Sequence, residues 1–308
     1  MTKPAIDAIL IAGPTASGKS ALALEVAERL GGLVINADSM QVYRDLRIIT
    51  ARPSPEDEAR APHALYGTVD GGQNHSVSRW LADARTTLRH AEHARLVPIL
   101  VGGTGLYFKA LTQGLSDIPD VPETIRAEIR AWATGRPPAE LHAALATRDP
   151  ATAVRLRPSD PQRLLRALEV NAATGASLAT LQSQRAPPVL AVDRCAAVFL
   201  APDRDTLRAR IDARFDSMMA NGALDEVRAL RQRRLDSSLP VMRAHGVPPL
   251  LRHIDGDIDL EAAVGQAKTD TRRYLKRQAT FARHQLPAFV WTEPTRALEF
   301  LLAAYSSS

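Results

Sequence analysis

The first hydrophobic segment of the chain predicts a strand, a turn and a helix. Apolar residues run from Ala5 to Ala12 with a single acidic interruption, as is typical of a strand buried on both faces of a parallel sheet. From Ser20 to Leu30 the apolar residues recur at the spacing of one helical face, and Gly31 and Gly32 end that pattern. A glycine-rich turn joins the two elements.

Three later segments also have the character of short buried strands. Because such strands alternate with helical patterns, the sequence predicts an α/β fold with a mainly parallel sheet covered on both faces. The three segments are Leu33–Ile35, Val97–Val101 and Cys195–Leu200.

The middle of the chain is helical and contains no convincing strand. Between Pro122 and Gln184 the helical segments are bounded by prolines and glycines, and Asp160 with Pro161 predicts an N-cap and a first helical residue. We therefore expect a helical insertion domain in the α/β core. The expected order is 1–120 for the first part of the core, 121–187 for the insertion and 188–308 for the return to the core with basic C-terminal helices.

Composition narrows the class of protein. The chain has 308 residues, 45% of them hydrophobic, which is enough to bury a large core. It contains no run of 18 apolar residues, and its one cysteine, Cys195, excludes an internal disulfide. No signal peptide is recognisable, so we expect a cytoplasmic protein with no membrane segment. The tail Ser306–Ser308 is expected to be disordered.

Charge is concentrated towards the C-terminus. The formal net charge is +5 and the pI is about 9.6, a basic excess that favours a polyanionic partner. Between Ala262 and Gln285 the chain has six basic residues and one acidic residue, Asp270, and this segment is a candidate phosphate-contacting surface. The bases are Lys268, Arg272, Arg273, Lys276, Arg277 and Arg283.

The turn after the first strand matches the complete phosphate-loop pattern G-x-x-x-x-G-K-[S/T], between a predicted strand and a predicted helix as the motif requires. A simple glycine turn is the alternative. Converging backbone amides, the helix dipole and the lysine would bind a diphosphate or triphosphate, and the Ser20 hydroxyl would bind Mg²⁺. The pattern does not identify the phosphate compound or its fate. Its residues are Gly13, Pro14, Thr15, Ala16, Ser17, Gly18, Lys19 and Ser20.

Two further polar motifs follow predicted strands at the edge where doubly wound sheets bind ligands. Asp38 opens the segment Asp38–Arg44, and Thr104 lies in the glycine-rich segment Gly102–Gly105. Both side chains should face the crevice beside the phosphate loop. For Asp38 the alternatives are a helix N-cap or a carboxylate associated with magnesium, and for Thr104 a structural turn.

Together these motifs resemble those of the tRNA dimethylallyltransferase family, and the resemblance extends through most of the chain. It implies a P-loop NTPase-like fold with a helical insertion domain. The matching segments are Gly13–Ser20, Asp38–Arg44, Gly102–Lys109, Gln162–Val170, Arg210–Met218 and Lys276–Arg283.

The resemblance also implies an activity. Family members transfer a dimethylallyl group from dimethylallyl diphosphate to the exocyclic amine of the adenosine next to the tRNA anticodon, with Mg²⁺ present. The implied roles are general base for Asp38, adenine contact for Thr104, and diphosphate stabilisation for Lys19 and an arginine. We favour Arg214 for that arginine, although Arg210 lies one helical turn away. The protein is expected to act as a monomer.

The family's tRNA-binding surface maps onto several separate segments. One departure is at Arg243, which many members follow with glycine, tyrosine and a base, but which this chain follows with Ala244–Pro248. Phe281 stands where tryptophan is usual, and His245 is interpreted as structural. The residues implied to contact tRNA are Asp38, Ser39, Met40, Gln41, Thr104, Arg126, Gln162, Arg163, Leu164, Leu165, Arg166, Arg243, Lys276, Arg277, Gln278 and Arg283.

Two other functions use a similar organisation. A P-loop small-molecule kinase also combines a phosphate loop with a helical insertion, and Val189–Asp193 would then be its magnesium-binding strand. An ATP- or GTP-dependent switch without transfer chemistry is the third possibility. The motifs at Asp38 and Thr104 and the basic C-terminal segment argue against both.

Overall fold

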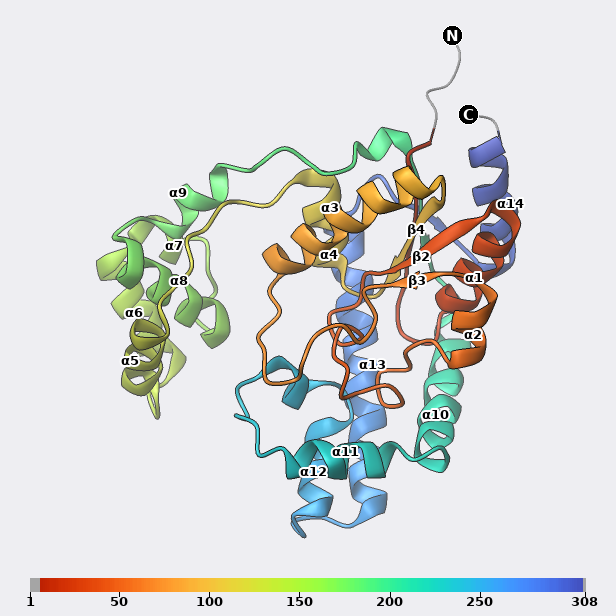
Figure 1. Ribbon diagram of the computed structural model, residues 1–308. Coiled ribbons are helices and arrows are strands. Elements are labelled where there is room, and N and C mark those ends of the chain that lie inside the picture. Colours follow the sequence, from red (N-terminus) through yellow and green to blue (C-terminus); the bar gives the residue numbers. More distant parts are fainter. Residues whose placement is uncertain (1–5, 307–308) are drawn as a thin grey trace. The chain divides into compact units, whose positions relative to one another are not determined.

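The computed structural model describes residues 6–306, and the chain divides into two compact units. The first unit is Met1–Thr112 with Val189–Ser308, and the second is Gln113–Pro188. The second unit contains the whole range 121–187 that the sequence assigned to an insertion. Figure 1 labels the elements of both units.

The first unit is built on a six-stranded parallel sheet with the strand order β3-β2-β4-β1-β5-β6. All four predicted strands are present, and only Ala5 of the first run lies outside the described residues. The short edge strands β3 and β6 were not predicted. The bounds are β1 Ala8–Ala12, β2 Gly32–Asn36, β3 His63–Ala64, β4 Val97–Gly102, β5 Cys195–Leu200 and β6 Val290–Thr292.

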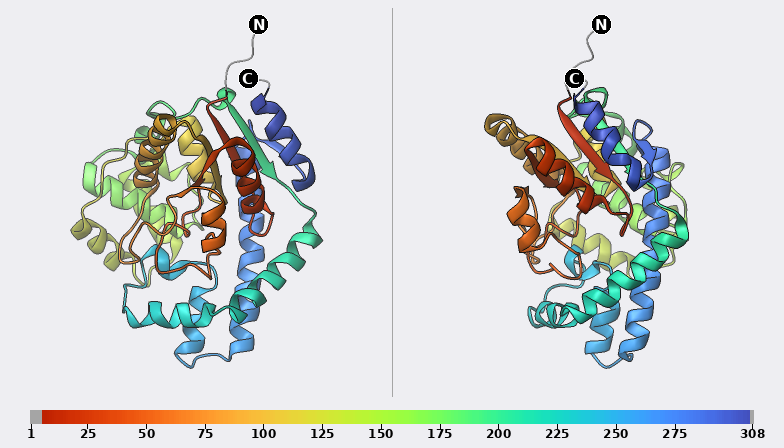
Figure 2. Two further views of the ribbon diagram at one scale, coloured as in Figure 1. Left: turned by 45° about the vertical axis from the view of Figure 1, so that its right-hand side comes forward. Right: turned by 90° about the vertical axis from the view of Figure 1, so that its right-hand side faces the viewer.

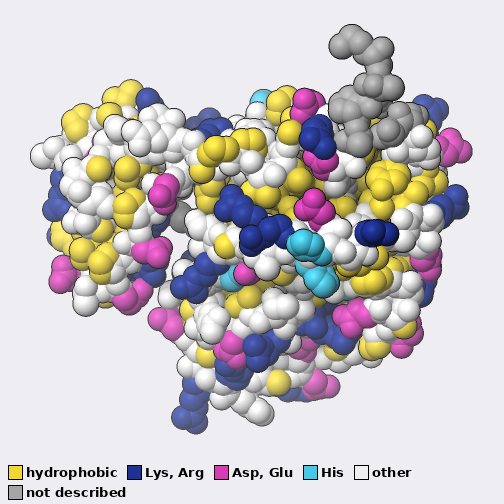
Figure 3. Space-filling model, turned by 45° about the horizontal axis from the view of Figure 1, so that its top comes forward, with side chains coloured by type: hydrophobic (Ala, Val, Ile, Leu, Met, Phe, Trp, Pro, Cys, Tyr) yellow, Lys and Arg dark blue, Asp and Glu magenta, His cyan; other side chains and the backbone are white. Residues whose placement is uncertain are grey.

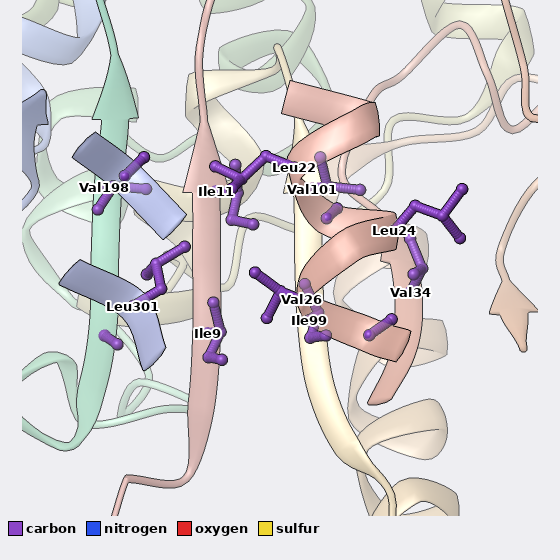
Figure 4. Packing of buried hydrophobic residues seen from close by; sticks show 14 of the residues in the cluster. Ile9, Ile11, Leu22, Leu24, Val26, Val34, Ile99, Val101, Val198 and Leu301 are labelled. Carbon is purple, nitrogen blue, oxygen red and sulfur yellow. The ribbon is translucent and has the colours of Figure 1, made fainter. Parts of the chain in front are cut away.

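Helices α1 (Lys19–Leu30) and α14 (Pro294–Ser306) pack together against one face of this sheet. Figure 4 shows Leu22 of α1 and Leu301 of α14 directed at the isoleucines and valines of the strands, and all these side chains are buried. Side chains alternate along a strand, so Leu10 and Leu100 point to the opposite face. The two termini of the described chain lie close together in both views of Figure 2.

The remaining helices of the first unit surround the sheet and extend from it. Residues 189–193, the segment assigned to a strand in the kinase alternative, form no strand, and a 3₁₀ turn (Val192–Arg194) precedes β5. Of the predicted disordered tail, Ser306 ends α14 and the last two residues lie outside the described range. The helices are α2 (Pro55–Arg60), α3 (Val77–Ala94), α4 (Gly105–Gln113), α10 (Arg204–Ala220), α11 (Ala223–Gln232), α12 (Val247–Ile254) and α13 (Leu260–Gln285), with a second 3₁₀ turn at Pro240–Arg243.

The second unit is entirely helical among the elements assigned to it and has a hydrophobic core of its own. As predicted, Asp160 caps α8: its carboxylate accepts a hydrogen bond from Arg163 N at 3.2 Å, and Pro161 is the first helical residue. Leu164 and Leu168 on the buried face of α8 pack with Leu145. The helices are α5 (Glu123–Ala133), α6 (Pro138–Arg148), α7 (Pro150–Ala153), α8 (Pro161–Thr174) and α9 (Leu178–Ser183).

No helix within residues 6–306 has the length and apolar character needed to cross a membrane.

Candidate active site

The phosphate loop connects β1 to α1 through two residues with left-handed backbone conformation. Gly18 has φ 88° and Ala16 has φ 64°. At Gly13 a Cβ would lie 2.7 Å from Ser17 Oγ, so a larger residue there would displace the Ser17 side chain. The loop ends at the N-terminus of α1, where unpaired backbone amides and the helix dipole favour an anion.

Two polar groups inside the loop are prepared for an anionic ligand. Burial, followed by the charge of Arg214, lowers the pKa of Lys19 to about 8, and Asp38 partly opposes that shift. The Lys19 Nζ donates a hydrogen bond to Pro14 O at 3.2 Å. Ser17 Oγ is buried and has no hydrogen-bond partner among residues 6–306. A bound phosphate would give Ser17 Oγ a hydrogen-bond partner and the Lys19 ammonium a group of opposite charge.

The end of β2 positions Asp38 through a turn. Asp38 Oδ1 accepts a hydrogen bond from Met40 N at 3.0 Å, and Asn36 Oδ1 accepts one from Asp38 N at 2.8 Å. No helix follows, so the alternative that Asp38 is a helix N-cap is wrong. One carboxylate oxygen fixes the turn, while the side chain still lines a cavity.

Thr104 is held against the same turn, at the end of β4. Its Oγ1 accepts a hydrogen bond from Ser39 N at 2.9 Å and donates one to Ser39 Oγ at 3.2 Å. The backbones are close here, because a Cβ on Gly102 would lie 2.0 Å from Ala37 O. The two strand-end motifs therefore meet at one edge of the sheet, as the sequence predicts.

Helix α13 completes this edge with side chains separated from the phosphate loop by most of the sequence. Gln278 Oε1 accepts a hydrogen bond from Thr15 N at 3.3 Å, and its Nε2 donates one to Gly103 O at 2.8 Å. Tyr274, one turn earlier, hydrogen-bonds Thr104 and Gln278, and burial raises the pKa of its hydroxyl. Gln278 is buried in these contacts. The prediction that it contacts tRNA is therefore corrected: its side chain joins the phosphate loop to the segment that follows β4.

These elements enclose a cavity of about 240 Å³ in the first unit. Its polar wall includes Asp38, Arg214, Arg243 and His245. The apolar part of its wall is formed by Ile49, Ile211, Phe215 and Met218. A cavity of this kind can accept a ligand that has both charged and hydrocarbon parts.

The structure distinguishes the two arginines that the sequence left open. Arg214 lines the cavity, where burial lowers the pKa of its guanidinium and Asp38 raises it. Arg210, one turn away on α10, is exposed and does not line the cavity. Arg214 is therefore the arginine placed beside Lys19 and Asp38.

His245 lies in the cavity wall, which the sequence interpretation did not foresee. Its ring centroid is 4.3 Å from that of Tyr274. Burial, followed by the charge of Arg277, lowers the pKa of His245, and this favours the neutral imidazole at pH 7.

The position of Tyr274 in the cavity wall could have been found from sequence, because it precedes Gln278 by one helical turn. Phe215 lies within the matching segment Arg210–Met218, whereas Ile49 carried no such signal.

The basic residues predicted to bind tRNA are distributed over both units. In the first unit Lys276, Arg277 and Arg283 are exposed on α13. Arg283 lies over the ring of Trp291 at 5.1 Å, and Arg277 over that of Tyr274 at 5.5 Å. The visible face in Figure 3 carries Lys and Arg in small groups interspersed with Asp and Glu. The charge therefore forms no single basic patch on that face.

The predicted tRNA contacts of the second unit lie on α5 and α8. Leu164 is fully buried in the core of this unit, so its assignment as a tRNA contact is corrected to a packing role. Arg126 pairs with Glu123 at 2.8 Å, and Arg163 pairs with Asp160 at 3.3 Å. Gln162 is exposed, whereas Leu165 and Arg166 are half-buried.

Comparison with known proteins gives a consistent result. The family model described as IPP transferase matches residues 41–285, and the one described as isopentenyl transferase matches residues 6–66. The chain is 62% identical over 303 residues to a tRNA dimethylallyltransferase of Methylocella silvestris, covering 98% of this chain and 100% of that protein. It is 60% identical to that of Beijerinckia indica, covering 96% and 98%.

Solved structures agree with the sequence matches. The full-length tRNA isopentenylpyrophosphate transferase of Bacillus halodurans superposes with a TM-score of 0.69 at 30% identity, covering 97% of this chain and 95% of that one. A eukaryotic dimethylallyltransferase acting on tRNA gives a TM-score of 0.77 at 25% identity, covering 97% of this chain and 77% of that one. The chain therefore belongs to the IPP transferase family, the tRNA dimethylallyltransferases.

Proposed function

We propose that this protein transfers a dimethylallyl group from dimethylallyl diphosphate to the exocyclic amine of the adenosine next to the anticodon of tRNA. The observation that carries the proposal is the placement of a carboxylate, Asp38, in one cavity with Arg214 and the phosphate-loop residue Thr15. A site that joins a candidate base to an anion-binding loop suits a reaction in which a diphosphate leaves and a proton is removed.

The chemistry assigns Asp38 to the acceptor. The lone pair of an exocyclic adenine amine is delocalised into the ring, so the amine is a weak nucleophile. As its nitrogen forms the new bond to the allylic carbon, the carbon–oxygen bond to the diphosphate breaks, and Asp38 takes the proton that the nitrogen loses. Thr104 is the residue proposed to hold the adenine, since it is fixed to the same turn as Asp38.

The phosphate loop acts on the leaving group. Its backbone amides, the Lys19 ammonium and the Arg214 guanidinium would stabilise the negative charge that develops on the departing diphosphate. Residues 6–306 contain no group of three or more His, Cys, Asp or Glu that could hold a metal ion. A Mg²⁺ ion would accordingly be bound by the exposed Ser20 hydroxyl and by donor phosphate oxygens and water, and it would neutralise diphosphate charge.

The tRNA is proposed to bind along basic residues of both units. Lys276, Arg277 and Arg283 on α13 would contact backbone phosphates, and Arg126, Gln162, Arg163 and Arg166 would do so from the second unit. A base in an anticodon loop must leave its stack to enter a cavity, and this requires a grip on the flanking backbone.

The proposal is tested by following an isotopic label. The protein is incubated with dimethylallyl diphosphate carrying ¹⁴C in the hydrocarbon part, with and without unmodified tRNA. Label should enter tRNA at the adenosine next to the anticodon, with release of an equal amount of diphosphate. Parallel reactions with γ-labelled ATP and GTP test the phosphotransferase alternatives. Consumption of either nucleotide with no label in tRNA would refute the proposed function.

A further inference from the structure

Glu226 of α11 binds three consecutive backbone amides with its carboxylate. Its Oε1 accepts hydrogen bonds from Arg47 N at 2.5 Å and Ile48 N at 2.9 Å, and its Oε2 accepts one from Ile49 N at 2.9 Å. Successive amides that converge on one anion form a backbone nest, a geometry often used to bind phosphates. Here the nest is occupied by a side chain of the protein itself. Glu226 also lies in the first turn of its helix, where the dipole favours a negative charge.

The segment held by this carboxylate forms part of the cavity wall. Ile49 and the next residue, Thr50, both line the cavity that contains Asp38. On its other side the segment is tied to the turn of Asp38, because Gln41 Nε2 donates hydrogen bonds to Thr50 O and Ala51 O, both at 2.9 Å. Residues 47–51 are therefore fixed from two directions.

Two further contacts limit the movement of this wall. A Cβ on Gly246 would lie 2.9 Å from Ile49 Cδ1, so the Ile49 side chain is already in close contact with the backbone there. Just beyond α11, Arg233 pairs with Asp45 and with Asp70, the latter at 2.8 Å. Residues from α11 and the turn that follows it thus hold the segment from Asp45 to Ile49 at both ends.

We propose that Glu226 is a positioning residue for the transfer reaction. It acts through the Ile49–Thr50 wall of the cavity that contains Asp38, and this wall holds the bound substrates at the distance and angle that proton removal and bond formation need. The inference rests on the proposed function. Its physical basis is that reaction rate depends steeply on geometry: a misplacement of about 1 Å can reduce a rate about a hundredfold.

The test compares two substitutions at Glu226 with a neighbour on the same helix. Glu226→Ala leaves the three amides without their acceptor. Glu226→Gln keeps the volume and one acceptor oxygen, but it presents an amide N–H₂ to one of the donors. Asp225→Ala is the matched control, because Asp225 is exposed and its carboxylate pairs with Arg228 on its own helix at 2.8 Å.

Single-turnover transfer is measured with saturating donor and tRNA, at a temperature at which circular dichroism shows each variant to be folded. The rate constant should fall about tenfold to a hundredfold in Glu226→Ala and by a smaller factor in Glu226→Gln. The dissociation constant for dimethylallyl diphosphate should stay within threefold of wild type. Asp225→Ala should react within twofold of wild type.

A role limited to folding predicts a different pattern. In that case the Glu226 variants would unfold at lower temperature but would transfer at the wild-type rate while folded, and this result would overturn the proposal. If Glu226→Ala does not fold, Glu226→Gln decides by the same criterion. Wild-type protein assayed in parallel separates the two proposals, because failure of the wild type to modify tRNA refutes the proposed function itself.

Discussion

At the scale of single residues, Asp38 has two separable tasks. One carboxylate oxygen accepts the Met40 amide and fixes the turn, and the carboxylate is also the proposed base. Asp38→Asn keeps an acceptor for Met40 N and cannot take a proton at neutral pH. Single-turnover transfer should therefore fall about a hundredfold to ten-thousandfold, while the donor dissociation constant stays within threefold. Rapid-quench transfer assays and donor titrations measure the two quantities.

The control for Asp38 is Asp225→Asn, which removes one carboxylate from an exposed helix position and should react like wild type. An Asp38→Asn protein that transfers within threefold of the wild-type rate would remove Asp38 from the proton-transfer step.

Lys19 predicts a pH dependence for donor binding. Its pKa is lowered to about 8 in the free protein, so the ammonium form that attracts a diphosphate predominates below pH 8 and is progressively lost above it. Bound diphosphate favours the charged form and raises the pKa, so affinity should decrease by about tenfold per pH unit between pH 8 and the pKa of the complex. Titration calorimetry from pH 7 to 9.5 should also show proton uptake on binding in the upper part of this range.

Lys19→Met provides the reference for this measurement. It should bind the donor more weakly at pH 7 and lose most of the pH dependence above pH 8. A wild-type affinity that is constant from pH 7 to 9.5 would show that the Lys19 ammonium does not contribute to donor binding.

How far the site could be predicted from sequence depends on how local each contact is. The phosphate loop, Asp38 and Thr104 were located because each directly follows a recognisable strand. The contact between Glu226 and the 47–49 amides joins segments far apart in the chain, and no spacing within either segment encodes it. The choice between Arg210 and Arg214 could be made in part from the sequence, because Arg214 lies closer to the middle of the apolar stripe on α10.

At the scale of secondary structure, α13 combines a buried face, which includes Thr271 and Gln278 among alanines, with an exposed basic face. Substituting Lys276, Arg277 and Arg283 by alanine should weaken tRNA binding and reduce its salt dependence, because each lost phosphate contact removes released counterions. The slope of log affinity against log salt should shrink by roughly 0.7 to 0.9 per contact, or about two units for three. Filter binding over a salt titration measures this slope.

A matched triple variant removes the same charge from other helices. Arg29, Arg89 and Arg228 are exposed on α1, α3 and α11, and their replacement by alanine should leave the slope within about half a unit of wild type. If both triple variants change the slope equally, net charge and not the face of α13 determines the affinity for tRNA. Donor binding should be unaffected in both.

Elements were predicted best where burial is greatest. The central strands consist of continuous apolar residues, so their hydrophobic runs were sufficient to find them. The edge strands have weaker signals: β3 has two residues, and Val290 and Trp291 of β6 are 44% and 37% exposed. Their assignment depends on hydrogen bonds to β2 and β5, which the sequence of an isolated segment does not specify.

At the scale of the whole molecule, we expect that donor binding does not require the second unit. The chain leaves and re-enters the first unit at adjacent points, because Leu111 O accepts hydrogen bonds from Val189 N at 2.9 Å and Leu190 N at 3.1 Å. A protein in which a short glycine–serine linker replaces residues 113–188 should fold and bind dimethylallyl diphosphate within about threefold of wild type. Its tRNA affinity should fall at least tenfold, because the proposed contacts of Arg126, Arg163 and Arg166 are removed.

Circular dichroism, donor titration and tRNA filter binding test these three expectations separately. Asp38→Asn in the shortened protein is the control for donor binding, since it leaves the phosphate loop unchanged. Wild-type tRNA affinity in the shortened protein would show that the first unit alone recognises the substrate. Loss of donor binding in a folded shortened protein would contradict the assignment of the donor site to the first unit.

The close packing of α14 on α1 has a consequence for synthesis on the ribosome. The chain is made from its N-terminus, so β1, the phosphate loop and α1 exist long before α14, the last helix, supplies Leu301. Until α14 is made, the apolar side chains of α1 lack part of their covering. Until α13 is made, Thr15 N lacks the oxygen of Gln278. The nascent protein is thus exposed to aggregation and to chaperones while it grows, and its donor site, although its phosphate loop is translated early, is completed only after α13 has been made.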